Sequence, residues 1–403
     1  MACLARFLKI AALATAALLS ACGGGGGGGG SGGGVVITDA GILKLALTDA
    51  PACGYEKINV TVQKVRVHQS STAADADAGW SEVTLAPAQR VDLLSLTNGI
   101  VLELGQVTLP VGKYRQMSLV LASNDAATPL ANAVTPIAQT ERALATPAGL
   151  QGGLKIPVDI DIVKDQVSDY VIDFDACNSV LRLGQPATGY DLSPKYTIVR
   201  RVSTTGQRVT GFVSTTLDPS TTRVSVQSNG TIVRSTTPDS TGRFVLYPVP
   251  AGTYDLVISA LDRVPAVVIG VPASDNTATD VNTSGTAIDP PSGLPTRTIN
   301  GTVNTGTTPV EARVAIVKKY TGGPDVVVFG APADATTGAL AYTVSSAAPV
   351  RATFTAGAPL VFGADNIGTP GRYTVAVTAK GTTQTADIDA TAGNPPPVSF
   401  NFP

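Results

Sequence analysis

Short runs in which apolar and polar residues alternate recur along this chain of 403 residues. In the first of them, Leu43, Leu45 and Leu47 are separated by Lys44 and a small residue. A period of two sends successive side chains to opposite faces of a β-strand, so each run predicts a strand with one buried face. The runs are closely spaced and bounded by turn residues, which is typical of β-sandwiches. We therefore expect a mainly β protein made of tandem β-sandwich domains.

One run changes its parity in the middle. The apolar positions are even-numbered up to Val62 and odd-numbered from Val65 onward. This predicts either a bulge near Gln63–Lys64 or a junction between two strands. Further along, Asn98–Gly99 predicts a tight turn.

Two more segments give expectations that a structure can test. Residues 80–85 and 91–96 have the composition of separate strands. Residues 122–153 are rich in Ala, Thr and Pro, which predicts a long excursion from the sheet. We expect a short helix around residues 139–144 within that excursion.

A motif of proline, glycine and tyrosine occurs three times, at Pro110–Tyr114, Pro250–Tyr254 and Pro370–Tyr373. Each copy precedes an alternating apolar run. The tyrosines are far enough apart for one motif per domain, which excludes a short-period solenoid. We interpret the motif as a turn that aims a strand, with the tyrosine ring covering the end of the core.

These motifs divide the chain into three β domains. We expect the first domain at residues 41–201, the second at 202–286 and the third at 298–403. Residues 287–297 hold several prolines, which predicts a semi-rigid linker between the last two domains.

The start of the chain resembles a bacterial lipoprotein signal. Arg6 and Lys9 precede an apolar run at 10–19, which is too short to cross a bilayer. The pattern Leu19-Ser20-Ala21-Cys22 then resembles the lipoprotein processing site. The resemblance implies that residues 1–21 are a cleaved signal peptide and that Cys22 carries lipid. The alternative is an ordinary secretory signal cut after Ala21.

Residues 22–40 are dominated by glycine, which predicts a flexible tether. Because glycine and not aspartate follows Cys22, the resemblance implies a lipid anchor in the outer membrane of a Gram-negative cell envelope. Cys3 would leave with the signal, so Cys53 and Cys177 remain. In an oxidising compartment we expect these two to form a disulfide. The alternative is two separate buried thiols.

Composition restricts the function further. The net charge of −2 and the lack of basic clusters give no sign of a nucleic-acid partner. His68 is the only histidine, and it lies beside a polar loop, where a surface position is the simplest interpretation. No nucleophile elbow or phosphate loop is found in the sequence. We therefore expect a protein that is not an enzyme.

Two pairs of aspartates are the best candidates for a ligand site. Asp159 with Asp161, and Asp173 with Asp175, each share a strand face, and Asp49 precedes a turn. Carboxylates are the ligands that calcium prefers, so calcium is the one cofactor that the sequence suggests. The alternative is that these aspartates form the solvated faces of half-buried strands, with Asp49 as a turn former.

Sugar binding would require an exposed aromatic platform. Trp80 is the only tryptophan, and it adjoins the polar loop 69–79. It could be such a platform, but a tryptophan at the start of a strand can also belong to the core. The low aromatic content of 5% argues against a flat polysaccharide-binding surface.

Several motifs resemble known families. One set resembles the bacterial domain of unknown function 4382 over residues 41–200: LTDAP (47–51), VDLL (91–94), LPVGKY (109–114), GLKI (153–156) and DFD (173–175). GRF (242–244) with VPAGTYDL (249–256) resembles the carboxypeptidase regulatory-like domain, and residues 298–403 resemble it more weakly. These resemblances imply exported β-sandwiches of prealbumin or immunoglobulin type without an established activity.

The sequence therefore favours a non-enzymatic lipoprotein of the bacterial envelope that acts as a structural or protein-interaction module. Its expected partners are the membrane, through the lipid, and an envelope protein or a glycan. The alternative is a carbohydrate-binding lipoprotein that uses its prealbumin-like domains, a function implied only by their likeness in fold to starch-binding modules. A third hypothesis, an enzyme centred on the first-domain aspartates, would need Asp49, Asp173 and Asp175 to converge in a deep cleft.

Overall fold

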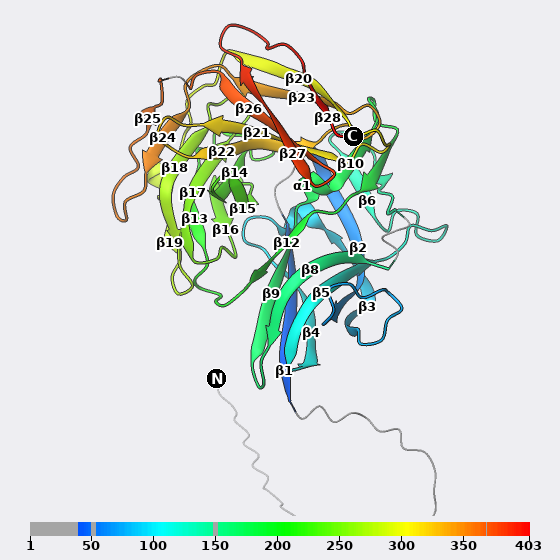
Figure 1. Ribbon diagram of the computed structural model, residues 1–403. Helices are drawn as coiled ribbons and strands as arrows, with labels where there is room; N and C mark the ends of the chain where they lie inside the picture. Colours follow the sequence, from blue (N-terminus) through cyan, green and yellow to red (C-terminus); the bar gives the residue numbers. More distant parts are fainter. Residues whose placement is uncertain (1–38, 50–53, 148–151, 368) are drawn as a thin grey trace, which may run out of the picture. The chain divides into compact units, whose positions relative to one another are not determined.

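Strands make up nearly all of the regular structure, as the alternating runs predict (Figure 1). The computed structural model describes residues 39–49, 54–147, 152–367 and 369–403. The predicted signal peptide, most of the predicted tether, and the residues Cys22 and Cys53 lie outside these ranges. Contacts between Cα atoms group Asp39–Pro403 into one compact unit. No helix in the described ranges is long and apolar enough to span a membrane.

The first domain is a sandwich of two sheets with one apolar core between them. One sheet has the order β12-β9-β1-β4, and the other has the order β7-β6-β2-β5-β8, with β3 paired to β2. The strands of the first sheet are β1 (Ala40–Asp49), β4 (Leu102–Pro110), β9 (Val167–Phe174) and β12 (Tyr196–Arg200). The strands of the second are β2 (Tyr55–His68), β3 (Ser81–Asp92), β5 (Gly112–Leu121), β6 (Ala133–Pro136), β7 (Arg142–Ala143) and β8 (Leu154–Ile162).

Smaller elements complete this domain: the 3-10 helix η1 (Leu93–Leu96), the helix α1 (Ala176–Ser179) and the hairpin β10 (Val180–Leu183) with β11 (Gly189–Leu192). The predicted bulge is confirmed, because β2 is continuous and its register shifts between Val62 and Lys64. The expected strand at 91–96 is wrong. The strand β3 ends at Asp92, whose side chain accepts a hydrogen bond from Leu94 N and caps η1.

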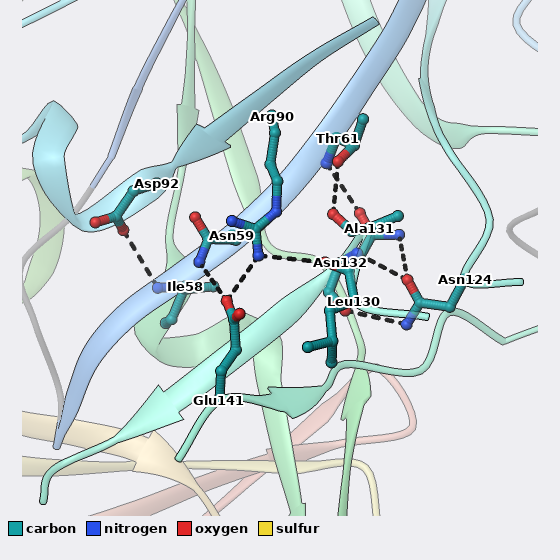
Figure 2. A network of polar contacts seen from close by, with 10 residues as sticks. All are labelled: Ile58, Asn59, Thr61, Arg90, Asp92, Asn124, Leu130, Ala131, Asn132 and Glu141. Carbon is teal, nitrogen blue, oxygen red and sulfur yellow. Dashed lines mark hydrogen bonds and ion pairs between the residues drawn. The ribbon is translucent and has the colours of Figure 1, made fainter. Parts of the chain in front are cut away.

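The predicted excursion from the sheet is wrong in part, because its described residues 122–147 contain β6 and β7, which extend the sheet beside β2. The helix expected around 139–144 is also wrong. Polar side chains fasten this segment to β2 and β3 (Figure 2). Asn132 Oδ1 accepts from Thr61 N at 3.0 Å, and Glu141 Oε1 accepts from Asn59 Nδ2 at 2.9 Å and from Arg90 Nη2 at 2.6 Å. Asn124 adds a further bond to Asn132 N, at 2.7 Å. The bonds from Asn59, Thr61 and Arg90 are long-range, and they hold the chain extended where its local composition permits a helix.

The second domain also has two sheets. The smaller one has the order β16-β13-β19, and the larger one has the order β15-β14-β17-β18-β24-β25. Its own strands are β13 (Val209–Phe212), β14 (Arg223–Ser228), β15 (Thr231–Thr236), β16 (Arg243–Leu246), β17 (Gly252–Ser259), β18 (Ala266–Ala273) and β19 (Thr279–Asp280). The 3-10 helix η3 (Ser284–Thr286) follows.

The third domain pairs a sheet β23-β20-β28 with a sheet β22-β21-β26-β27. Its strands are β20 (Thr296–Asn304), β21 (Ala312–Lys319), β22 (Asp325–Pro332), β23 (Ala339–Ser345), β26 (Arg372–Ala379), β27 (Thr382–Asp389) and β28 (Val398–Asn401). The predicted linker hydrogen-bonds to the second domain through Ile288 O, which accepts from Ser214 N, and through Pro291 O, which accepts from Val264 N.

The larger sheet of the second domain contains strands from two predicted domains, and we call it the shared sheet. β24 (Val350–Thr353) and β25 (Gly363–Ala364) come from the third domain, and β24 pairs with β18 in parallel. Both faces of this sheet are covered. Leu256 and Val268 belong to the core of the second domain, whereas the neighbouring Val257 and Val267 pack into the core of the third.

The prediction for the proline-glycine-tyrosine motif is confirmed. Tyr114, Tyr254 and Tyr373 are all buried in their domain cores. The hydroxyl of Tyr254 donates to Pro250 O at 2.9 Å, and Tyr114 makes the same bond to Pro110 O at 3.3 Å. In the third copy, which is one residue shorter, Tyr373 donates instead to Ser345 O at 2.8 Å.

Candidate functional site

The three predicted domains meet around a cavity of about 350 Å³, which we call the junction cleft. Its wall includes one basic side chain from each domain, Lys195, Arg223 and Arg313, together with two carboxylates of the first domain, Asp173 and Asp175. Much of the remaining wall is apolar. Clefts of this size with a few convergent polar groups are common ligand sites.

The two aspartates enter the cleft because of how β9 ends. Asp173 is the penultimate residue of β9, and Asp175 follows the strand and caps α1. The period of two places both on one face, as the sequence predicts. Asp175 Oδ1 accepts from Asn178 N at 3.1 Å, and its Oδ2 accepts from Asn178 Nδ2 at 2.7 Å. Its carboxylate is thus occupied in shaping the local chain.

Asp173 forms an ion pair with Arg234 of the second domain, with 2.5 Å between Oδ2 and Nη1. Both side chains are buried. Burial raises the pKa of Asp173 above its ordinary value, and the charge of Arg234 opposes this shift. The Nε of Arg234 also donates to Pro248 O at 3.3 Å. The pair therefore joins two domains across a water-poor contact.

The basic side chains are held by other contacts. Arg313 Nε donates to Asn178 O at 3.2 Å, and its Nη2 donates to Ser193 O at 2.9 Å. Arg223 Nη2 donates to Ser235 Oγ at 3.2 Å. Burial lowers the pKa of Arg223 and of Arg313, and Asp175 opposes both shifts. The cleft thus brings cationic groups together where water solvates them poorly.

The other aspartate pair does not reach the cleft. Asp159 and Asp161 lie on β8, in the opposite sheet of the first domain, with exposed side chains. Asp159 pairs with Arg115, and Asp161 pairs with Lys113 at 2.9 Å. No group of three or more metal-binding side chains occurs in the described part of the chain. Calcium binding stays a prediction.

Asp49 has a structural contact of its own. It is the last residue of β1 and is 2% exposed. Its Oδ1 accepts a hydrogen bond from Ala176 N at 2.9 Å, which holds the first residue of α1 against the end of β1. Asp49 does not line the junction cleft. The convergence of Asp49 with Asp173 and Asp175 that an enzyme would need is therefore not found in this cleft.

Trp80 and His68 lie together at the loop 69–79. The guanidinium of Arg66 lies 4.4 Å from the Trp80 ring centre, and the His68 ring lies 5.1 Å away. Trp80 Nε1 donates to Ala74 O at 2.9 Å. His68 Nδ1 accepts from Ser70 N at 2.9 Å, and its Nε2 lies 3.0 Å from Ala78 O. Both rings therefore fasten this loop.

Cys177 lies in α1, is buried, and is disulfide-bonded. The pairing with Cys53 stays a prediction, because Cys53 lies outside the described residues. Lipidation of Cys22 stays a prediction for the same reason.

Sequence reasoning missed the four basic residues of the junction, Lys195, Arg223, Arg234 and Arg313. They are isolated along the chain and come from three predicted domains, so no local motif marks them. Arg234 lies in β15 among positions that the structure shows to be buried, which the sequence alone did not mark. A lone arginine at an inward strand position requires a partner elsewhere in the fold.

Comparison with solved structures finds β proteins at low similarity. A mutant type II cohesin–X-dockerin complex from Acetivibrio cellulolyticus is 23% identical, with 22% of this chain and 59% of that chain covered and a TM-score of 0.19. A putative adhesin from Bacteroides ovatus is 11% identical, with 50% and 90% covered and a TM-score of 0.17. The major pilin subunit of Bacillus cereus is 13% identical, with 90% and 99% covered and a TM-score of 0.15. Similarity at this level does not indicate a shared function.

Comparison with curated protein sequences finds no match. A family model, by contrast, covers nearly all of the first domain. Residues 40–194 match the family described as a domain of unknown function (DUF4382), which confirms the resemblance of the motifs between residues 41 and 200.

Proposed function

We propose that this chain is a non-enzymatic lipoprotein of the bacterial cell envelope, acting as a structural or protein-interaction module. The observation that carries the proposal is the shared sheet, which has both faces buried and takes strands from two predicted domains. A sheet buried on both faces ties its neighbours together over a wide apolar area. Such an arrangement suits a rigid spacer or docking platform.

Specific polar contacts add to this apolar attachment. Gln227 Nε2 donates to Val327 O at 2.7 Å, and Val327 N donates to Gln227 Oε1 at 2.8 Å, which joins the second and third domains. On the other side, Val245 N donates to Asn98 Oδ1 at 2.6 Å, which joins the second domain to the first. With the Asp173–Arg234 pair, these bonds fix the three domains in one register.

The anchor is the second part of the proposal. The motif at residues 19–22 and the glycine tract after it support a lipid on Cys22 and a flexible connection to the β unit. Three acyl chains on one residue exceed the roughly two signals that stable anchoring requires. The proposal therefore places a rigid unit on a flexible tether at the membrane surface.

Metabolic labelling tests the anchor. Cells expressing the full chain are grown with an alkyne analogue of palmitate, and the protein is recovered from membranes. We expect label on the wild-type protein and none on Cys22→Ser. The matched control is Cys3→Ser, which alters a cysteine of the predicted signal and should leave labelling unchanged. Label retained on Cys22→Ser would contradict the lipoprotein assignment.

A glycan array tests the interaction part against the carbohydrate-binding alternative. The soluble chain starting at Ser31 is screened after its folding is confirmed. The proposal expects no reproducible glycan binding, and crosslinking in the intact envelope should then join the chain to a discrete protein. Reproducible binding that Trp80→Ala abolishes would contradict the proposal and favour the alternative.

A further inference from the structure

Besides Arg223, whose buried Nε has no hydrogen-bond partner among the described residues, two cationic groups at the junction cleft have donors without a partner. No bond from Lys195 Nζ to any described residue is found. Arg313 uses Nε and Nη2 to bind Asn178 O and Ser193 O, and its Nη1 likewise has no partner among the described residues. The Ser193 contact keeps the Arg313 guanidinium against the segment that carries Lys195. The fold therefore positions two sets of free donors at one cleft.

These two cations repel each other, and the fold holds them together. The charge of Arg313 is the main cause that lowers the pKa of Lys195; partial burial adds to it, and Asp175 opposes it. A second cation close enough to shift the pKa of a lysine is an unfavourable arrangement. An anion between the two groups would remove the repulsion and use the free donors.

The carboxylates near the cleft are already engaged. Asp173 pairs with Arg234, and Asp175 accepts two bonds from Asn178. Glu311, which opposes the pKa shift of Arg313, accepts from Ser193 Oγ at 3.3 Å. Arg223 adds a third cation to the wall. Among the described residues, the donors that remain free at the cleft belong to cationic groups, and one carboxylate oxygen of the wall, Asp173 Oδ1, also lacks a hydrogen-bond partner.

The rest of the wall determines what kind of anion fits. Apolar side chains from all three domains form it: Tyr196, Ile232, Val233, Val314, Val327 and Ala376. A strongly hydrated inorganic anion would lose solvation against these groups without compensation. An apolar body attached to the anionic group would instead gain from burial there.

We propose that the junction cleft binds a small carboxylate with an apolar body, whose carboxylate lies between Lys195 and Arg313. The carboxylate can belong to a free acid or to the carboxyl terminus of an apolar peptide. The cleft volume of about 350 Å³ admits a ligand of this size. The site is independent of the proposed structural role, because a rigid unit does not require a ligand.

Isothermal titration calorimetry on the soluble chain starting at Ser31 tests the proposal. The probes are hexanoate, inorganic phosphate, glucuronate and hexylammonium. We expect hexanoate to bind at one site with a Kd on the order of 1 mM, and the other three to bind at least tenfold more weakly. An acetylated dileucine peptide with a free carboxyl terminus, compared with its amide, shows whether a peptide end binds better than the free acid.

Lys195→Met is the decisive variant, because Lys195 is exposed and its Nζ makes no hydrogen bond to a described residue. We expect at least a tenfold loss of hexanoate affinity without a fall in melting temperature, because the variant also removes the repulsion between Lys195 and Arg313. Lys57→Met, on an exposed part of β2, is the matched control and should bind as the wild type does. No hexanoate binding by the wild type, equal binding by Lys195→Met, or tighter binding of phosphate would overturn the proposal.

Discussion

Lys318 shows how much a single residue of this fold depends on its surroundings. Its side chain is fully buried in the third domain, where Nζ donates to the carbonyl oxygens of Thr369 and Arg372 and lies 4.1 Å from the Tyr373 ring centre. Burial lowers the pKa of Lys318 to about 7, and Asp365 opposes the shift. The alternation in β21 places Lys318 on the inward face with Val314 and Ile316, but nothing in the sequence marks Thr369 and Arg372 as its partners.

The lowered pKa predicts a pH dependence of stability. Between pH 7 and the ordinary lysine value of 10.5, the unfolded chain binds a proton that the folded chain lacks, so the free energy of unfolding contributed by Lys318 rises with pH. Urea unfolding should show an increase of roughly 2 kcal/mol from pH 7 to pH 9. Lys318→Met should lack this increase, because methionine binds no proton in either state. Equal slopes for both proteins would contradict the assignment.

The Asp173–Arg234 pair gives a second residue-scale prediction. Removing one partner leaves a buried charge, so Arg234→Met should lower the free energy of unfolding by about 3 kcal/mol. Arg115→Met, which breaks an exposed pair with Asp159, should change it by less than about 1 kcal/mol. Combining Arg234→Met with Asp173→Leu should recover part of the loss. Similar losses for Arg234→Met and Arg115→Met in urea unfolding would show that the junction pair is not buried.

At the scale of elements, the Asn98–Gly99 turn shows what local sequence can predict and what it cannot. The turn itself was predictable, and both residues have positive φ, 57° and 80°. Its docking on the second domain was not, because the same dipeptide closes any tight hairpin. A Cβ on Gly99 would lie 2.5 Å from Val245 Cγ1. Glycine is therefore required by packing as well as by the turn.

This predicts different outcomes for two similar turns. Lys380–Gly381 has φ values of 49° and 75°, and a Cβ on Gly381 would meet nothing within 4 Å. Gly381→Ala should cost about 1 kcal/mol for the strained backbone alone. Gly99→Ala should cost roughly 2 kcal/mol more, from overpacking against Val245. Thermal melts of the two variants provide the measurement, and equal losses would mean that the Asn98 turn is free of the second domain.

The shared sheet marks the limit of sequence reasoning at this scale. The alternation of apolar and polar residues predicted where strands lie and which of their residues face the core, as in β1 and the bulged β2. The pairing of β24, from the third predicted domain, with β18 of the second could not be predicted. The sequence of a strand does not show which strand it pairs with. One signal was available in β18, where residues 266–269 are apolar without a break. A continuous apolar run indicates a strand buried on both faces.

At the scale of the whole molecule, the predicted domains are attached to one another by apolar and polar contacts. The sequence predicted a chain of separate sandwiches with a linker at 287–297. The structure adds a shared sheet, a buried ion pair and reciprocal amide bonds that connect all three predicted domains. Each contact joins residues that lie far apart in the sequence, so periodicity and motif spacing carry no information about it. The junction cleft and its basic groups depend on these same contacts.

Differential scanning calorimetry of the soluble chain starting at Ser31 tests this attachment most directly. If the three domains are held together as described, they should unfold in one transition whose calorimetric and van 't Hoff enthalpies agree. Arg234→Met should lower the temperature of that transition as a whole. Two or three separate transitions in the wild-type protein, with only one of them shifted by Arg234→Met, would contradict the account of a single rigid unit.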